Sequence, residues 1–273
     1  MVRIVVDSTA YLPRKLATSW GVRVVPLSYI YAGEMYPDEF VEDLPSARIQ
    51  MERYVQSAKT SQPAVKAFIA EFSDLRREGH DIVCITLSSR LSGTHSCACV
   101  AAKQVDEANI EVVDSLTTAY GMYLMCERAV SMAARGKSKE EIKADLLEMR
   151  NRIGLVMTVD TLEPLQRGGR LNMMRQSLST LFNTKPILTL TNGIVLPRGV
   201  SRNTKSAIKD MADMIPGDAT RIGIMHVAAF DKLMEFTDRV STLFPKVRIE
   251  PWEIGPVVGI HVGPGTVGVA WLR

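Results

Sequence analysis

Residues 82–95 read Ile-Val-Cys-Ile-Thr-Leu-Ser-Ser-Arg-Leu-Ser-Gly-Thr-His. An apolar run ends at Leu87, a small polar loop with one glycine follows, and a helix-like stretch runs over 96–105. Short, continuous apolar strands that alternate with helices are typical of a parallel sheet covered by helices. The stretch therefore predicts an α/β fold, with a polar loop at the carboxyl end of a buried strand.

This loop is also a candidate binding site. The first backbone N–H groups of a helix have no partner within the helix and carry the positive end of its dipole. Ser92 and Thr94 add hydroxyl donors at the same point, so the loop can hold a carboxylate or a phosphate. Ordinary helix capping by Ser or Thr is the alternative, and the loop alone favours capping.

The composition indicates a soluble globular protein of one large or two modest domains, with 273 residues, 46% hydrophobic and 23% charged. A net charge of +3 and the absence of a long basic run argue against nucleic acid as a partner. The chain opens directly on a strand-like segment, and no apolar run reaches about 18 residues. We therefore expect neither a signal peptide nor a membrane-spanning segment, and a cytoplasmic location.

The cysteines give no sign of a metal site. Cys84, Cys97, Cys99 and Cys126 lie in predicted core strands or helices, and none forms a Cys-x-x-Cys pair. We expect buried, reduced thiols rather than a zinc site or a disulfide framework.

The first half of the chain alternates strands and helices. The predicted strands are 2–6, 22–27, 81–87 and 110–113, and the predicted helices are 13–19, 63–77, 96–105 and 117–134. Between them, residues 29–59 form an excursion from the main sheet, with a hairpin and one helix over 44–57. The pattern predicts a mostly parallel sheet flanked by helices.

The character of the sequence changes after Arg150, and we place a domain boundary near residue 153. The expected domains are 1–153, including the excursion, and 154–273. In the second, the predicted strands are 154–159, 186–190, 194–196, 221–227 and 247–251, and the predicted helices are 204–214 and 231–243. A cleft between two α/β domains is a favoured ligand site.

Polar residues follow three of the strands in the first half, in the segments 7–9, 88–94 and 114–115. Ligands of such sheets bind outside the carboxyl ends of the strands. Asp7 and Asp114 are therefore candidate catalytic acids, although strand-end aspartates more often act as caps or loop anchors. Thr60-Ser61-Gln62-Pro63 is a second hydroxyl-rich helix start, open to the same two interpretations.

Two unusual segments lie in the second half. Residues 166–170, Gln-Arg-Gly-Gly-Arg, place paired glycines between arginines; this is either an oxyanion site or a solvated surface turn. Residues 255–266, Gly-Pro-Val-Val-Gly-Ile-His-Val-Gly-Pro-Gly-Thr, have too many glycines and prolines for a core strand and too many branched apolar residues for a flexible linker. His261 at their centre is a candidate carboxylate partner, proton carrier or metal ligand.

Together, these motifs resemble a known family. The matching segments, in order, are 6–9, 60–63, 91–94, 113–115, 167–170, 185–188 and 255–268 with His261. Each is short, but the ordered set spans nearly the whole chain. It resembles the DegV family of bacterial lipid-binding proteins, which includes the fatty-acid-binding subunits of fatty acid kinase.

The resemblance implies two α/β domains around a long apolar tunnel that holds one fatty acid. The residues at the family's carboxylate-binding positions are Thr60, Ser92 with its neighbours Gly93 and Thr94, Arg170 and His261. It also implies a carrier that performs no chemistry and has no catalytic residue, metal or cofactor. Such a carrier presents the fatty acid to a separate ATP-dependent kinase for acyl-phosphate formation in phospholipid metabolism. No Walker A loop or dinucleotide fingerprint is visible, so a partner must bring the nucleotide.

The chain departs from the family pattern at three positions. Val200 stands where the family often has a lysine in the segment associated with kinase docking, while Arg202 of that segment remains. His95 replaces an aromatic or amide side chain, and its role is open. Arg167 replaces the lysine before the paired glycines and keeps its charge.

Two other functions remain open from the sequence. One is a serine hydrolase with Ser92 as nucleophile, His261 as base and Asp114 or Asp7 as the orienting acid; the Gly-x-Ser-x-Gly elbow of the α/β-hydrolases is missing. The other is a module that binds a phosphate-bearing ligand at the same helix starts. The sequence leaves open the acyl-chain preference, the oligomeric state and the identity of the kinase.

Overall fold

The computed structural model describes residues 1–38, 40, 42, 53–171 and 184–273. By its internal contacts the chain divides into two compact units. Of the described residues, the first takes those within 1–42 and Lys59–Asn151, and the second takes residues 53–58 and those within Arg152–Arg273. The domain limits expected from the sequence differ in assigning all of 29–59 to the first domain.

The first unit is built on a four-stranded parallel sheet in the order β2-β1-β6-β7. Its strands are β1 (Val2–Asp7), β2 (Arg23–Val25), β6 (Asp81–Thr86) and β7 (Ile110–Asp114). Residues 82–86 of the central strand β6 are all buried, which explains the continuous apolar run in the sequence. The predicted parallel sheet is confirmed.

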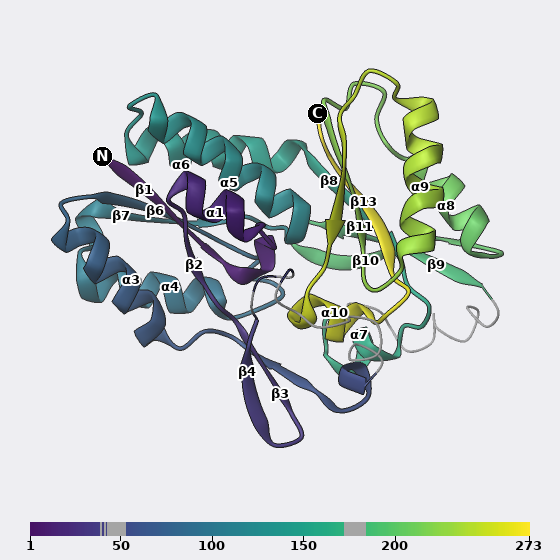
Figure 1. Cartoon of the computed structure of the whole chain (residues 1–273), viewed down its shortest axis with the longest axis horizontal. Coiled ribbons are helices and arrows are strands. Elements are labelled where there is room, and N and C mark those ends of the chain that lie inside the picture. Colours follow the sequence, from purple (N-terminus) through teal and green to yellow (C-terminus); the bar gives the residue numbers. More distant parts are fainter. Residues whose placement is uncertain (39, 41, 43–52, 172–183) are drawn as a thin grey trace. The chain divides into compact units, whose positions relative to one another are not determined.

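Helices cover both faces of this sheet (Figure 1). On one face lie α1 (Arg14–Trp20), α5 (Ala119–Ala134) and α6 (Lys139–Met149), and on the other lie α3 (Val65–Arg77) and α4 (Thr94–Val105). Phe68, Phe72 and Leu75 of α3 recur at helical spacing and are buried in one core with α4 and the sheet. Helix α6, which a Ser138–Glu141 capping box begins, is not among the predicted helices.

The excursion contains the predicted hairpin. Strands β3 (Ser28–Tyr31) and β4 (Glu34–Pro37) pair antiparallel, and β5 (Lys59–Ser61) adds to β3 to give the order β4-β3-β5. Residues 53–57 are helical, and most of the helix expected over 44–57 lies outside the described residues. The pairing of Thr60 with Tyr29 fixes the backbone of the 60–63 motif.

The second unit contains a six-stranded mixed sheet in the order β10-β9-β8-β13-β11-β12. The strands are β8 (Ile153–Thr158), β9 (Lys185–Thr191), β10 (Ile194–Ser201), β11 (Arg221–His226), β12 (Ile249–Glu253) and β13 (Val267–Leu272). Helices α8 (Thr204–Asp213) and α9 (Phe230–Leu243) pack on it and share its core. Strand β13, which lies at the centre of the sheet between β8 and β11, is not among the predicted strands.

The glycine- and proline-rich segment 255–266 is half helix and half turn. Helix α10 (Pro256–Val262) starts with Pro256 at a first-turn position, where proline is favoured, and ends at Gly263 with a φ of 83°. It lies beside the short helix α7 (Glu163–Arg167), as Figure 1 shows. The fold therefore brings the 166–170 and 255–266 segments together.

A close contact in the second sheet gives a first prediction. Gly154 of β8 pairs with Trp271 of β13, and a Cβ at Gly154 would lie 2.6 Å from Nε1 of the indole. We expect Gly154→Ala to destabilise the protein by about 1–3 kcal/mol through overpacking, measured by urea unfolding. Gly217→Ala is the control, because a Cβ at Gly217 meets nothing within 4 Å. Equal unfolding midpoints for the two variants would contradict the packing argument.

Candidate functional site

Asp7, at the end of β1, joins the carboxyl ends of two neighbouring strands. Its carboxylate is fully buried and accepts hydrogen bonds from the backbone N–H of Thr9 at 3.0 Å, the Thr9 hydroxyl at 2.6 Å and the backbone N–H of Leu87 at 2.7 Å. Burial raises the pKa of Asp7 to about 6, and these hydrogen bonds offset only part of that effect. The geometry supports the structural interpretation of Asp7.

Asp114 anchors the same loop from the other side. Its Oδ1 accepts hydrogen bonds from the backbone N–H groups of Ser89 at 3.0 Å and Leu116 at 3.1 Å. Leu116 and Ala119, which flank the following turn, have φ values of 52° and 51°. Such left-handed backbone is costly for non-glycine residues and is often found at functional sites, where the surroundings enforce it. Asp114 therefore holds the loop beside a strained turn.

The loop 88–94 is a tight turn that leads into α4. The carbonyl of Ser88 accepts the N–H groups of Leu91 at 3.0 Å and Ser92 at 3.3 Å. The hydroxyl oxygens of Ser92 and Thr94 lie 2.9 Å apart, and the N–H of Thr94 points at the Ser92 oxygen at 3.4 Å. Helix α4 begins at Thr94, two residues before the predicted start, so both hydroxyls lie at the N-terminus of the helix.

The 60–63 motif contacts this loop within the first unit. The Gln62 carboxamide lies against Gly93, and its Nε2 donates a hydrogen bond to Sγ of Cys97 at 3.0 Å. The structure thus brings the motif of Thr60 together with that of Ser92. Gln62 is part of the predicted motif, but the sequence pattern indicates no role for it.

In the second unit, His261 lies on the paired-glycine motif. A Cβ at Gly168 would lie 2.9 Å from Cε1 of His261 and would also overlap Nδ1. Gly169 has a φ of 70°, and the Arg170 guanidinium turns back to donate a hydrogen bond to the carbonyl of Gly168. Arg170 and His261, which are 91 positions apart in the printed sequence, therefore meet at the same glycine.

The His261 imidazole is uncharged at neutral pH. Burial is the main cause that lowers its pKa, and the positive charges of Arg170 and Arg167 lower it further, to about 4. A neutral imidazole has one N–H donor and one acceptor nitrogen. The group can thus donate one hydrogen bond to an anion while Arg170 supplies the positive charge.

A cluster of charged residues fixes the turn that follows His261. Asp160 Oδ1 lies 2.7 Å from Nζ of Lys185 and 3.0 Å from Nζ of Lys232, and Lys232 also donates to the carbonyl of Gly265 at 2.7 Å. Burial alone would raise the pKa of Asp160, but the two lysines outweigh it and hold the pKa below its ordinary value. Asp160 and Lys232 were not singled out from the sequence, and the pattern gave no signal for them.

His95, whose role the sequence left open, lies against Thr86, the last residue of β6. Its Nδ1 lies 3.1 Å from Oγ1 of Thr86 and its Nε2 lies 3.5 Å from Sγ of Cys99. Burial lowers its pKa. All four cysteines are free thiols, and Cys99 alone among them is partly exposed.

The candidate residues thus fall into two groups, one in each unit. Thr60, Ser92, Gly93 and Thr94 belong to the first unit, and Arg170 and His261 belong to the second. Arg202, the candidate docking residue, is exposed between β10 and α8.

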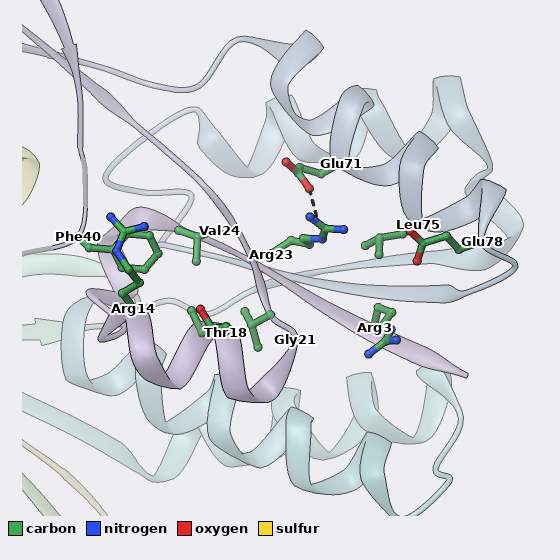
Figure 2. A pocket seen from close by; sticks show the side chains of 12 residues that line it. Arg3, Arg14, Thr18, Gly21, Arg23, Val24, Phe40, Glu71, Leu75 and Glu78 are labelled. Atoms are coloured by element: carbon green, nitrogen blue, oxygen red, sulfur yellow. Dashed lines mark ion pairs between the residues drawn. The ribbon is translucent and has the colours of Figure 1, made fainter.

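A groove of about 470 Å³ runs along β2 in the first unit (Figure 2). Its lining includes Arg3, Arg14 and Arg23, but none of the six candidate residues. Arg23 faces Glu71 at 3.8 Å, and the Arg14 guanidinium lies 4.4 Å from the centre of the Phe40 ring. The groove is therefore separate from these six candidate residues.

Comparison with known proteins identifies the family. A family model described as "Uncharacterised protein, DegV family" matches residues 1–273. The chain belongs to the DegV family. Protein DegV of Bacillus subtilis is 28% identical over 276 residues, covering 99% of this chain and 98% of the relative. A DegV domain-containing protein of Halalkalibacterium halodurans is 31% identical over 278 residues, with the same coverage.

Solved DegV family structures share the whole fold. A DegV family protein from Thermus thermophilus, described for its fatty acid binding, has a TM-score of 0.90 at 29% identity and covers 100% of this chain and 99% of its own. DegV of Bacillus subtilis, described as a fatty acid binding protein, has a TM-score of 0.87 at 28% identity, covering 99% and 98%. A stearic acid-binding protein from Eubacterium ventriosum has a TM-score of 0.88 at 26% identity, covering 100% and 98%.

The α/β fold class and the DegV resemblance are therefore confirmed. These structural neighbours bind fatty acids, according to their descriptions. Within the described part of this DegV chain, no helix combines the length and the apolar character needed to cross a membrane.

The buried carboxylate of Asp7 predicts a pH effect on stability. Because its pKa rises from 3.8 to about 6 on folding, the folded protein binds more protons than the unfolded chain between these values. The contribution of Asp7 is therefore most favourable below pH 4, and about 3 kcal/mol is lost as the pH rises through 6. Urea unfolding from pH 4 to 7 should show this fall in wild type and a flatter profile in Asp7→Asn.

The exposed Asp231 supplies the control for this experiment. Asp231→Asn should keep the wild-type pH profile. An Asp7→Asn profile as steep as that of wild type would show that another group causes the fall.

Proposed function

We propose that this protein binds a long-chain fatty acid in an apolar tunnel. The hydroxyls of Thr60 and Ser92, with Thr94 beside them, and the donors of Arg170 and His261 bind the carboxylate. The observation that carries the proposal is the pair of hydroxyl groups 2.9 Å apart at the start of α4, against which the 60–63 motif packs. The fatty acid binding described for DegV relatives of the same fold supports it.

The donor types suit a carboxylate. An ionised carboxylate only accepts hydrogen bonds, and hydroxyls, the N–H groups at a helix start and a guanidinium all donate them. A hydrogen bond to a charged group contributes about 1.5–3 kcal/mol. Each buried methylene of the acyl chain contributes about 0.8 kcal/mol. The acyl chain of the fatty acid therefore supplies most of the affinity. The residues that bind the carboxylate select a free acid over an ester.

We further propose that the protein is a carrier and that a separate ATP-dependent kinase phosphorylates the bound carboxylate to an acyl phosphate. In this scheme the chain supplies no catalytic residue or cofactor and acts in the cytoplasm, in phospholipid metabolism. The exposed Arg202, with the exposed Val200 two residues before it, is the proposed docking position for the kinase.

The head-group proposal predicts which substitutions remove the lipid. Mass spectrometry of extracts from purified protein should identify a co-purified fatty acid. Ser92→Ala, Thr60→Ala, Arg170→Ala and His261→Ala should each weaken binding of added oleate by about 10-fold or more, because each removes a hydrogen bond to a charged group. Titration of delipidated protein measures the affinity.

Two exposed residues provide matched controls, Ser96 on α4 and Arg198 on β10. Ser96→Ala and Arg198→Ala should bind oleate as wild type does. Extraction of only a sugar phosphate or nucleotide would favour the phosphate-ligand module, and full oleate affinity in both Ser92→Ala and Arg170→Ala would refute the head-group site.

The hydrolase alternative predicts Ser92-dependent turnover of a chromogenic ester with an initial burst. We expect no such turnover, because the Ser92 hydroxyl forms a hydrogen bond with the Thr94 hydroxyl. The two candidate acids, Asp7 and Asp114, accept hydrogen bonds from backbone N–H groups. The measurement is p-nitrophenyl ester hydrolysis by wild type and Ser92→Ala. A burst present in wild type and absent in the variant would overturn the carrier proposal.

A further inference from the structure

Gly93 is glycine because of a neighbouring side chain rather than its own backbone. Its φ of −74° and ψ of 4° are open to any residue. A Cβ at this position, however, would overlap Oε1 of Gln62 and lie 2.9 Å from Cδ and 3.1 Å from Nε2. The oxygen and the carbon of the carboxamide therefore lie closer to Gly93 than a Cβ there would allow, so a side chain at this position would displace the exposed Gln62 side chain from its present place.

Cys97 holds the carboxamide in this position. It lies one turn along α4 from Gly93, and its backbone N–H donates to the Gly93 carbonyl at 3.0 Å. Its Sγ accepts the hydrogen bond from Nε2 of Gln62 at 3.0 Å. Gln62 is thus fixed by a contact at the start of α4 and by a hydrogen bond one turn further on.

This contact lies between the two hydroxyl-bearing motifs. Thr60, two residues before Gln62, is held by strand pairing with Tyr29. Ser92 and Thr94 are the two neighbours of Gly93, and their hydroxyls are 2.9 Å apart. The Gln62 side chain therefore links the backbone that carries Thr60 to the turn that carries Ser92.

We propose that Gln62 is the positioning residue of the head-group site. It does not itself bind the ligand, but it holds the Thr60 and Ser92 motifs at the separation that lets both hydroxyls reach one carboxylate. The inference rests on the proposed fatty acid binding and adds a determinant of its selectivity for a free acid over a neutral ester. Several donors can bind one carboxylate together only if neighbouring residues hold them in the right positions.

The test measures the affinities of delipidated protein for oleate and for methyl oleate. Gln62→Ala and Cys97→Ala should each lower the oleate affinity by about 10-fold and leave the methyl oleate affinity close to that of wild type. A general loss of folding would lower both affinities, so the ratio of the two reports on positioning. Gln104 is an exposed glutamine on α4, the helix that carries Cys97. Gln104→Ala should leave the ratio unchanged.

A double-mutant cycle tests the contact itself. Gly93→Ala should lower the oleate affinity strongly in wild type, but should have little further effect in the Gln62→Ala background, where the added methyl group finds room. Equal effects of Gly93→Ala in both backgrounds, or a wild-type ratio in Gln62→Ala, would overturn the role of Gln62 while leaving fatty acid binding intact. If wild type bound oleate and methyl oleate equally, the carboxylate site and this inference would fail together.

Discussion

The carboxyl end of the first sheet, where the loop with the candidate Ser92 begins, depends on the hydrogen bonds that the buried carboxylate of Asp7 accepts. It accepts hydrogen bonds from the segments that follow two neighbouring strands, β1 and β6. Burying an ionisable group is costly, and the cost shows in its pKa of about 6. The hydrogen bond to Leu87 fixes the start of the loop that carries Ser92, because Leu87 leads directly into that loop. Asp114 repeats the device from β7, so two carboxylates fix one loop.

A second constraint is the close approach of polar side chains to glycines. The Gln62 carboxamide lies on Gly93 in the first unit, and the His261 imidazole lies on Gly168 in the second. In both cases a planar polar group lies where a Cβ would otherwise stand. The glycines of the two motifs thus serve side chains far away in the sequence, and each contact brings two candidate motifs together.

Much of the fold could be read from local patterns, and the failures have physical causes. Continuous apolar strands predicted the parallel sheet, and the excursion over 29–59 was expected to hold a hairpin, which β3 and β4 form. By contrast, α6 is amphipathic through only three buried residues, Ile142, Leu146 and Met149, a weak signal in a charged segment. Strand β13 is itself an apolar run, interrupted by Gly268, and glycine weakens a strand pattern. Its central position depends on pairing with β8 and β11, which no local pattern encodes.

The α/β class, the family and the motifs that carry hydroxyl, guanidinium and imidazole groups follow from composition, periodicity and motif order, which are properties of the chain alone. What those groups touch depends on the fold. It placed Gln62 on Gly93 and joined it to Cys97, and it set His261 on Gly168 beside Arg170, where burial and positive charge keep the ring neutral. Contacts and desolvation arise only when distant segments pack together, and they give each motif its chemistry.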